Sequence, residues 1–331
     1  MIAWIEAAGP WAPWLFLLLF LAASLLMIWR LEALNATGLE GTVLGTLVMP
    51  YCSGIGNLIF AFVMAKKKDS GGEVLTNCLV NNVTNLTLLI GLPTIFWGQA
   101  GAQKKSKGSK KQKQKETQER RINKLSMLLT LAAVLFFTGA VLLLAGDGLI
   151  SASKGLILIS MFLFWQCFHV FDVLKSNVRK NQSFGWMLPV DLLLLGVGAY
   201  GIYISTDWLV DWISKMHSGF ISAQYLGWLS GWLMVVPNGL LAFYYARRGN
   251  PEVVYTSQVG DGHICIPLCI GVFALFQPIR APASFETGLI ILLATAVLHF
   301  CSIALWGRLP RFLGWVLTAA YGVFLYTGLL K

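Results

Sequence analysis

Long apolar stretches separated by short polar ones run along the whole chain. The pattern marks ten apolar segments, at residues 12–30, 40–65, 73–98, 125–146, 152–176, 186–205, 222–247, 253–277, 286–306 and 309–329. Each is close to 20 residues or longer, the length a helix needs to cross a bilayer core of roughly 30 Å. The alternation over about 10 residues that marks membrane β-strands is not seen. The sequence therefore predicts an all-α integral membrane protein with ten transmembrane helices.

Composition supports this class and excludes a soluble fold. Of 331 residues, 56% are hydrophobic and 12% charged, and the mean hydropathy is +0.68, far from the balance of a soluble domain. All six cysteines fall inside apolar segments: Cys52, Cys78, Cys167, Cys265, Cys269 and Cys301. Thiols in such surroundings behave as small apolar groups, so we expect neither disulfides nor a bound metal or other cofactor.

The basic residues predict how the chain is oriented. The formal net charge is +10, but most lysines and arginines lie in loops beside the apolar segments. Anionic lipid therefore explains them better than nucleic acid does. Loops after the odd-numbered segments carry most of the basic residues, and such loops stay in the cytoplasm. We expect a multi-pass protein of an inner or plasma membrane, with both termini on the non-cytoplasmic side.

The longest loop, between the third and fourth segments, has low complexity. It reads GQAGAQKKSKGSKKQKQKETQERRINK and contains almost nothing that a protein core could bury. Residues at about 100–124 are therefore predicted to be disordered and cytoplasmic. Their charge would favour contact with anionic lipid headgroups.

The segments divide evenly at a short polar linker near residues 180–183. Residues 1–180 would form one five-helix repeat, and residues 181–331 the other. Because each half has an odd number of spans, two similar halves must insert with opposite orientations. Inverted repeats of this kind are typical of secondary transporters, in which the substrate binds at mid-membrane where interrupted helices meet.

Corresponding stretches of the two halves, Val48–Asn85 and Met234–Pro267, have the same layout. Each contains an apolar segment interrupted by glycine or proline, a short turn, and a second apolar segment that opens with polar residues. The interruptions involve Ser53, Gly54, Gly56 and Asn57 in the first half, and Pro237, Asn238 and Gly239 in the second. Such breaks free backbone carbonyls that protein, water or an ion must satisfy.

The polar residues that follow each interruption repeat every four positions, and so share one helix face. They are Asn77, Asn81 and Asn85 in the first half, and Ser257, Asp261 and Cys265 in the second. Converging side-chain oxygens suit a hard cation that must shed its water. The predicted ion or substrate site comprises Ser53, Asn57, Asn77, Asn81, Asn85, Asn238, Ser257, Asp261 and Cys265. The alternative is that these groups only hydrogen-bond between packed helices.

Two further ionisable residues are candidates for a proton path. His263 lies two positions from Asp261, and could pass protons or simply be a hydrogen-bonded packing residue. Asp191 opens the sixth segment, where a helix N-terminus or interfacial exposure could equally explain it.

These stretches resemble the cation/calcium exchanger superfamily, to which the sodium/calcium exchangers belong. VMPYCSGIGNLIFAF is similar to the signature that ends in Gly-Thr-Ser-x-Pro-Glu-Leu, and TNCLVNNVTNL to the segment Gly-Asn-x-x-Gly-Ser-Asn-x-x-Asn. VVPNGLLAFYYARRGNPEVVYTSQVGDGHICIPLCIG has the same spacing in the second half. The resemblance covers about 40 residues in each half. It implies the family fold, alternating access by sliding of the first and sixth spans, and a cation substrate.

The charged residues depart from the family pattern. The resemblance places Asn57 and Asn238 where the family has its two central glutamates, and Gly56 where it has a proline. Asp261, at a family serine position, is the one carboxylate left. Because a buried divalent ion needs negative charge as well as oxygens, calcium exchange fits poorly. A monovalent cation, a proton cycle on Asp261 or a different solute fits better.

The function predicted from the sequence is secondary active transport of a cation, coupled to sodium or protons. The main alternative is a non-transporting membrane scaffold or assembly protein derived from an exchanger. A passive channel and transport of another solute are further alternatives. An enzyme is not expected, since no catalytic motif of known spacing occurs and most loops are short.

Overall fold

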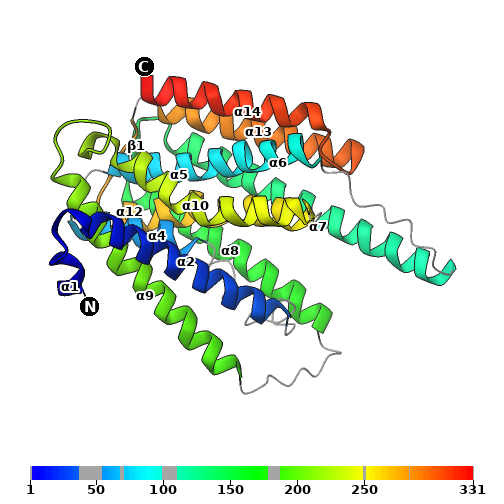
Figure 1. The fold of residues 1–331 in the computed structure, drawn as a ribbon. Coiled ribbons are helices and arrows are strands. Elements are labelled where there is room, and N and C mark those ends of the chain that lie inside the picture. The colour runs from blue at the N-terminus through cyan, green and yellow to red at the C-terminus, as the bar shows by residue number, and fades with distance from the viewer. Residues whose placement is uncertain are drawn as a thin grey trace.

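The computed structural model describes residues 2–36, 54–67, 71–98, 110–177, 187–248, 251–282 and 284–330. Together they form a bundle of helices (Figure 1). Eight helical stretches in this part of the chain are long and apolar enough to cross a membrane. The 13-residue helix α4 (Ile55–Lys67) lies in the predicted second span. In the predicted fifth span, helix α8 (Ala152–Asn177) contains a shorter apolar stretch, Ala152–Phe168. The all-helical membrane architecture is confirmed, and the count of ten stays a prediction.

The elements follow the predicted segments closely. The first half contains α1 (Ile2–Glu6), η1 (Gly9–Trp11), α2 (Ala12–Ala36), α4, α5 (Gly71–Leu86), α6 (Leu88–Phe96), α7 (Lys110–Leu144), β1 (Leu149–Ile150) and α8. The second half contains α9 (Met187–Ser214), η3 (Ala223–Tyr225), α10 (Leu226–Arg247), α11 (Pro251–Ile264), η4 (Cys265–Cys269), α12 (Ile270–Phe276), β2 (Ile279–Arg280), α13 (Phe285–Trp306), α14 (Arg311–Leu325) and η5 (Tyr326–Leu330). The elements η4 and η5 are π-helical.

The basic tract differs from its prediction. Helix α7 begins at Lys110, so residues 110–124 continue the fourth span as a helix and are not disordered. In Figure 1 this part of α7 projects beyond the rest of the bundle. The reason lies in its residues, because 110–124 contain no Gly or Pro and are rich in Lys, Gln, Glu and Arg, which favour helix. The apolar span supplies the nucleus from which this helix extends.

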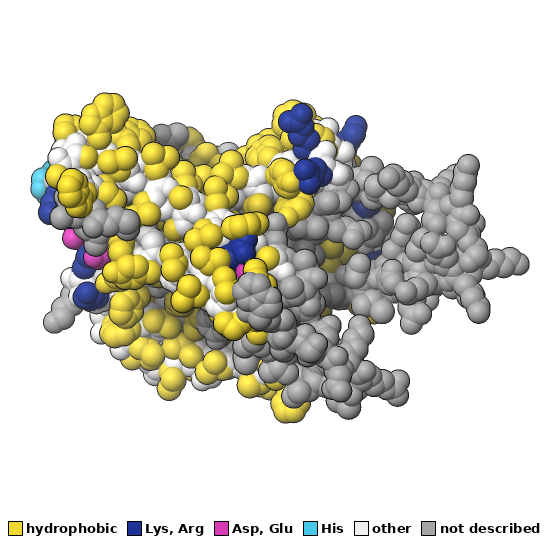
Figure 2. All heavy atoms as spheres, turned by 60° about the horizontal axis from the view of Figure 1, so that its bottom comes forward, with side chains coloured by type: hydrophobic (Ala, Val, Ile, Leu, Met, Phe, Trp, Pro, Cys, Tyr) yellow, Lys and Arg dark blue, Asp and Glu magenta, His cyan; other side chains and the backbone are white. Residues whose placement is uncertain are grey.

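Helices α2 and α9 lie side by side on one flank of the bundle (Figure 1). Large apolar side chains of α9, including Leu193, Val197 and Tyr200, are exposed there. Figure 2 shows hydrophobic side chains across most of this face, with charged ones at its left end and upper right and a basic and an acidic side chain in the middle. An apolar belt between charged ends is what a surface facing lipid requires.

Two spans occupy the centre of the bundle. In an apolar 18-residue window within each of the stretches Gly71–Phe96 and Ser257–Phe276, 78% and 75% of the residues are buried, against 28% in the corresponding window of the stretch that contains α2. Both central spans are interrupted midway. The first breaks at Thr87, between α5 and α6, and the second widens into the π-helical turn η4, which includes Pro267. Interruptions of this kind often mark functional sites in membrane helices.

The packing partners repeat across the two halves. Helix α6, the second part of the third span, packs on α14, and α12, the second part of the eighth span, packs on α8. Each broken span therefore packs its second part against the last helix of the other half, an arrangement that two inverted repeats would produce.

The predicted interruption of the seventh span is not a break in the helix. Helix α10 runs continuously from Leu226 to Arg247 with Pro237 inside it. Proline removes one backbone donor, and a membrane helix tolerates this when neighbouring groups serve the freed carbonyl. In the first half, α4 begins just after Gly54, and Ser53 lies outside the described residues.

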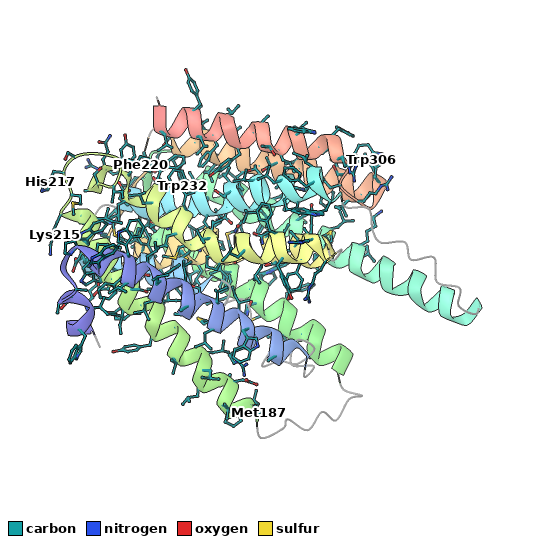
Figure 3. The ribbon with its side chains drawn as sticks, viewed as in Figure 1. Met187, Lys215, His217, Phe220, Trp232 and Trp306 are labelled. Carbon is teal, nitrogen blue, oxygen red and sulfur yellow. The ribbon has the colours of Figure 1, made fainter. Side chains whose placement is uncertain are left out.

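Both chain ends lie at the same end of the bundle (Figure 1). Lys215, His217 and Phe220 are also at that end, whereas Met187 and Trp306 lie at the other (Figure 3). Strands β1 and β2 pair antiparallel, with Leu149 opposite Arg280 and Ile150 opposite Ile279. This short ladder joins the loop after α7 to the loop after α12, and so ties the two halves together.

Candidate functional site

A group of buried polar residues lies where α4, α5, α10 and α11–η4 meet. These helices contact one another, and glycines allow two of the contacts to be close. A Cβ atom added to Gly54 would lie 2.6 Å from Cγ2 of Ile264, and one added to Gly56 would lie 2.6 Å from Sδ of Met234. The glycines therefore bring the start of α4, and Asn57 with it, against the second half of the chain.

Helix α5 supplies the largest share of the polar groups. Asn77, Asn81 and Asn85 are all fully buried, as their four-residue spacing on one face predicts. Other polar residues of α5 serve packing. Asn82 donates from Nδ2 to the carbonyl of Cys78 at 2.7 Å, and Thr84 donates to the hydroxyl of Tyr321 at 3.4 Å. The bond of Asn82 stays within α5, whereas that of Thr84 joins α5 to α14.

Two asparagines of α5 reach across to the other half. Asn77 donates from Nδ2 to Oγ of Ser230 on α10 at 3.0 Å, and Asn81 donates to Sγ of Cys265 on η4 at 3.2 Å. Each amide uses its nitrogen for this contact. The Oδ1 atoms of both residues are buried and accept no hydrogen bond.

Two further carboxamides also have an oxygen without a hydrogen-bond donor. Oδ1 of Asn57 and Oε1 of Gln258 are also buried and accept no hydrogen bond, although Gln258 donates from Nε2 to the carbonyl of Asn238 at 3.4 Å. We call these four residues the amide cluster: Asn57, Asn77, Asn81 and Gln258. They come from both halves of the chain, and each has a buried side-chain oxygen that accepts no hydrogen bond. A buried acceptor left without a partner costs about 1–3 kcal/mol, so the cluster favours a ligand that needs oxygens.

The sequence-based prediction missed Gln258 because it took Ser257 and every fourth residue after it as the polar face. In α11 the Ser257 side chain is only half-buried, whereas that of Gln258 is fully buried. A stripe through positions 258, 261 and 265, with steps of three and four, has helical spacing equally well. Among the described side chains of α11, the buried face thus includes Gln258 rather than Ser257.

The structure places the other candidates as follows. Cys265 is buried beside Asn81, and Asn238 is half-buried, with its backbone carbonyl in contact with Gln258. Asp261 and His263 belong to α11, but their side chains lie outside the described part of the chain. Asp191 is not at the amide cluster. It lies on α9 and forms a buried ion pair with Arg30 of α2, at 3.1 Å between Oδ1 and Nη1.

His299 makes a hydrogen bond at the break in the third span. The sequence alone did not indicate this partner. Its Nε2 lies 2.8 Å from the carbonyl oxygen of Leu86, the last residue of α5. A carbonyl only accepts, so Nε2 must carry the proton and donate. The imidazole is fully buried and meets the ring of Tyr255 edge to face, with 5.3 Å between ring centroids. The contact lies next to Asn85 in the chain.

We expect His299→Leu to lower the free energy of unfolding by about 1–2 kcal/mol, because it removes a buried donor between helices. His299→Gln should keep most of the stability, since its amide can donate to the same carbonyl. Thermal unfolding of the two purified variants in detergent checks this. Equal unfolding temperatures for both variants would mean that the contact with Leu86 contributes nothing.

The chemistry available to the amide cluster is binding. Among the residues that the structure describes, no three or more His, Cys, Asp or Glu side chains are arranged to hold a metal ion. The cluster offers neutral oxygens as acceptors, and Asn77, Asn81 and Gln258 use their amide nitrogens in hydrogen bonds within the protein. Such a site can surround a cation of low charge.

Known proteins share this architecture. The structure superposes on the sodium-calcium exchanger NCX_Mj soaked with 2.5 mM Na+ and 10 mM Sr2+, with a TM-score of 0.67 and 17% identity over 99% of this chain and 100% of that one. For the same exchanger soaked with 100 mM Na+ and 10 mM Sr2+, the TM-score is 0.66, with 18% identity over 99% of both chains. These likenesses confirm the predicted fold. No curated protein matches the chain.

The sequence also matches the profile of the family described as sodium/calcium exchanger protein, over residues 10–171 and 190–330. The match covers nearly all of both halves, including every helix that contributes to the amide cluster. The resemblance noted in the sequence is thereby confirmed, and with it the class of multi-pass membrane transporter. The chain belongs to the sodium/calcium exchanger family.

Proposed function

We propose that this protein is a secondary active antiporter that moves a monovalent cation by alternating access, in exchange for sodium or protons. The observation that carries the proposal is the amide cluster, with four buried carboxamide oxygens that accept no hydrogen bond. Empty, these oxygens together cost several kcal/mol, and a cation that they coordinate would offset that cost.

Charge favours a monovalent ion over calcium. Asn57 and Asn238 stand where the family resemblance places glutamates, which leaves Asp261 as the charged group of the predicted site. One carboxylate balances one positive charge, whereas a divalent ion would keep a net charge in a medium of low dielectric constant. In this proposal Asp261 is the charged ligand or the proton carrier, and the neutral oxygens complete the shell.

Transport also needs an element that moves. Helices α2 and α9 lie on the flank of the bundle, outside the two central spans that hold most of the polar groups. We propose that these two helices slide across the central spans and expose the site to each side in turn. The end that carries both termini would be non-cytoplasmic. The basic part of α7, at the opposite end, would then lie near the anionic headgroups of the cytoplasmic leaflet.

The test is a flux screen in proteoliposomes, with gradients of sodium, potassium, calcium, magnesium, manganese and protons. We expect saturable uptake of a monovalent cation that requires a counter-ion, and its loss in Asp261→Asn. Glu286→Gln makes the same chemical change at an exposed position of α13 and should keep full activity. If no gradient drives flux and both variants match the parent protein, the chain is not a transporter and the scaffold interpretation holds. Flux without saturation or counter-ion would instead indicate a channel.

A further inference from the structure

A polar contact at the end of α4 holds helix α9. Nζ of Lys67, the last residue of α4, donates to the backbone carbonyl of Asp207 at 3.0 Å and to Oδ1 of Asp211 at 2.6 Å. It also lies 3.3 Å from Oδ1 of Asp207. The two aspartates are one helical turn apart and share a face of α9. We call these three residues the Lys67 clamp. It lies toward the end of the bundle that carries both chain termini, where Lys215 follows α9 (Figure 3).

The Lys67 clamp joins two groups of helices. Helix α4 carries Asn57 of the amide cluster. Helix α9 packs mainly on α2, where Trp208 stacks on Phe16 with 4.3 Å between ring centroids and Asp191 pairs with Arg30. Within the described ranges, the clamp is the one ion pair that connects α9 to a helix of the amide cluster. It therefore ties the α2–α9 pair to the helices that hold the site.

The contacts of the clamp can exist in one position of α9 only. Hydrogen bonds act at about 3 Å, and a slide of α9 along α4 by one helical turn, about 5.4 Å, would break all three contacts. In this structure all four residues of the amide cluster are buried, so the clamp is formed while the site is closed. An interaction that is present in one state alone shifts the equilibrium toward that state.

We propose that the Lys67 clamp keeps the site closed at the end of the bundle that carries both termini, and that ionic strength controls it. The inference rests on the proposed function, because it needs α2 and α9 to slide across the central spans. The side chains of Asp207 and Asp211 are 38% and 56% exposed, so dissolved ions reach them. The screening length falls from about 10 Å at 0.1 M salt to about 3 Å at 1 M. High salt therefore weakens the clamp and favours movement of α9.

The chain offers a matched control for the chemistry of the clamp. Asp147 and Lys154 form an ion pair at 2.6 Å. Both lysine side chains, Lys67 and Lys154, are 23% exposed, and the carboxylates of Asp147 and Asp211 are 64% and 56% exposed. The control pair joins the loop after α7 to the start of α8, so it does not involve α2 or α9. Lys154→Met thus removes an equivalent ion pair without releasing α9.

The position of α9 can be measured by double electron–electron resonance on the full-length protein in lipid. Spin labels at Lys215→Cys, just after α9, and Tyr326→Cys, just after α14, report their separation, because both positions are exposed. The exposed native cysteines Cys167 and Cys301 are replaced by serine. We expect two distances. The ratio of the minor to the major one should rise about 2- to 5-fold in Lys67→Met, as loss of an exposed ion pair allows.

Further variants test whether ion pairing is the cause. Asp207→Asn/Asp211→Asn should raise the ratio as Lys67→Met does, whereas Lys67→Arg and Lys154→Met should match the parent protein. Raising choline chloride from about 0.05 M to about 1 M should raise the ratio in the parent protein but not in Lys67→Met, which has no clamp left to screen. If Lys67→Met leaves the ratio unchanged, or Lys154→Met raises it equally, the clamp does not hold α9.

This measurement needs no ion flux, so it separates the two proposals. Cation flux together with a distance ratio that ignores both Lys67→Met and salt overturns the clamp and leaves the antiporter standing. A ratio that responds to both, in a protein through which no gradient drives flux, overturns the antiporter and leaves the clamp as a conformational switch.

Discussion

Asp191→Ala is expected to lower the free energy of unfolding by about 3–5 kcal/mol, because it leaves a buried guanidinium without its counter-charge. Arg30 and Asp191 are paired at 3.1 Å, and their side chains are only 10% and 5% exposed. Nε of Arg30 already has no hydrogen-bond partner. Among the described residues, the ring of Trp29 also supports Arg30, 3.2 Å from the guanidinium carbon, and such a contact contributes about 2 kcal/mol when desolvated.

Two comparison variants test whether the loss of stability comes from the unpaired buried charge. Asp211→Ala breaks an ion pair with Lys67 whose carboxylate is 56% exposed, and such a pair contributes only about 0–1 kcal/mol. The double variant Arg30→Met/Asp191→Leu replaces both charges by apolar groups and should recover most of the stability. Unfolding by denaturant in detergent micelles measures all three. A loss for Asp191→Ala no larger than that for Asp211→Ala would show that water reaches the Arg30–Asp191 pair.

The position of this ion pair bears on transport. It joins α2 to α9, the two helices that we propose move across the central spans, so its contacts lie inside the moving unit. A buried pair there resists separation of the two helices, since each charge would have to enter the lipid alone. The pair therefore favours joint movement of α2 and α9 over independent movement of either.

Much of the fold was predictable because a membrane helix is specified by length and hydropathy alone. Most predicted segments lie within a few residues of an observed helix. The two large differences, the extension of α7 to Lys110 and that of α9 to Ser214, occur where helices continue past the apolar stretch. Helix ends outside the apolar stretch depend on propensity and packing, which hydropathy does not report.

The site was predictable where residues recur on one helix face, and not where they depend on a distant partner. The spacing of Asn77, Asn81 and Asn85 identified the buried face of α5. The bond from His299 to the carbonyl of Leu86 spans 213 positions, and the Arg30–Asp191 pair spans 161. The sequence carries no local signal for such contacts. The phase of α11, which buries Gln258 more fully than Ser257, also depends on tertiary packing.

The double variant Asn57→Glu/Asn238→Glu is expected to bind and transport calcium, which the parent protein should not. At an effective dielectric constant of about 20, a carboxylate about 4 Å from a divalent ion gains roughly 8 kcal/mol before desolvation. If only about 3 kcal/mol of this remains, calcium affinity rises about 100-fold. Asn57 is 3% exposed, so an empty carboxylate there is itself destabilising. Calcium should therefore raise the unfolding temperature of the variant as well as drive uptake.

Asn57→Gln/Asn238→Gln is the matched control, because glutamine has the length of glutamate without its charge. It should show neither calcium uptake nor a calcium-dependent rise in unfolding temperature. If the glutamate and glutamine variants behave alike, charge is not what separates this site from a calcium site. If the parent protein already transports calcium, its neutral oxygens and Asp261 suffice for a divalent ion, and the argument for a monovalent cargo fails. If only the glutamate variant gains calcium transport, the number of carboxylates at this site determines the charge of the transported ion, because the helices around the site are the same in both variants.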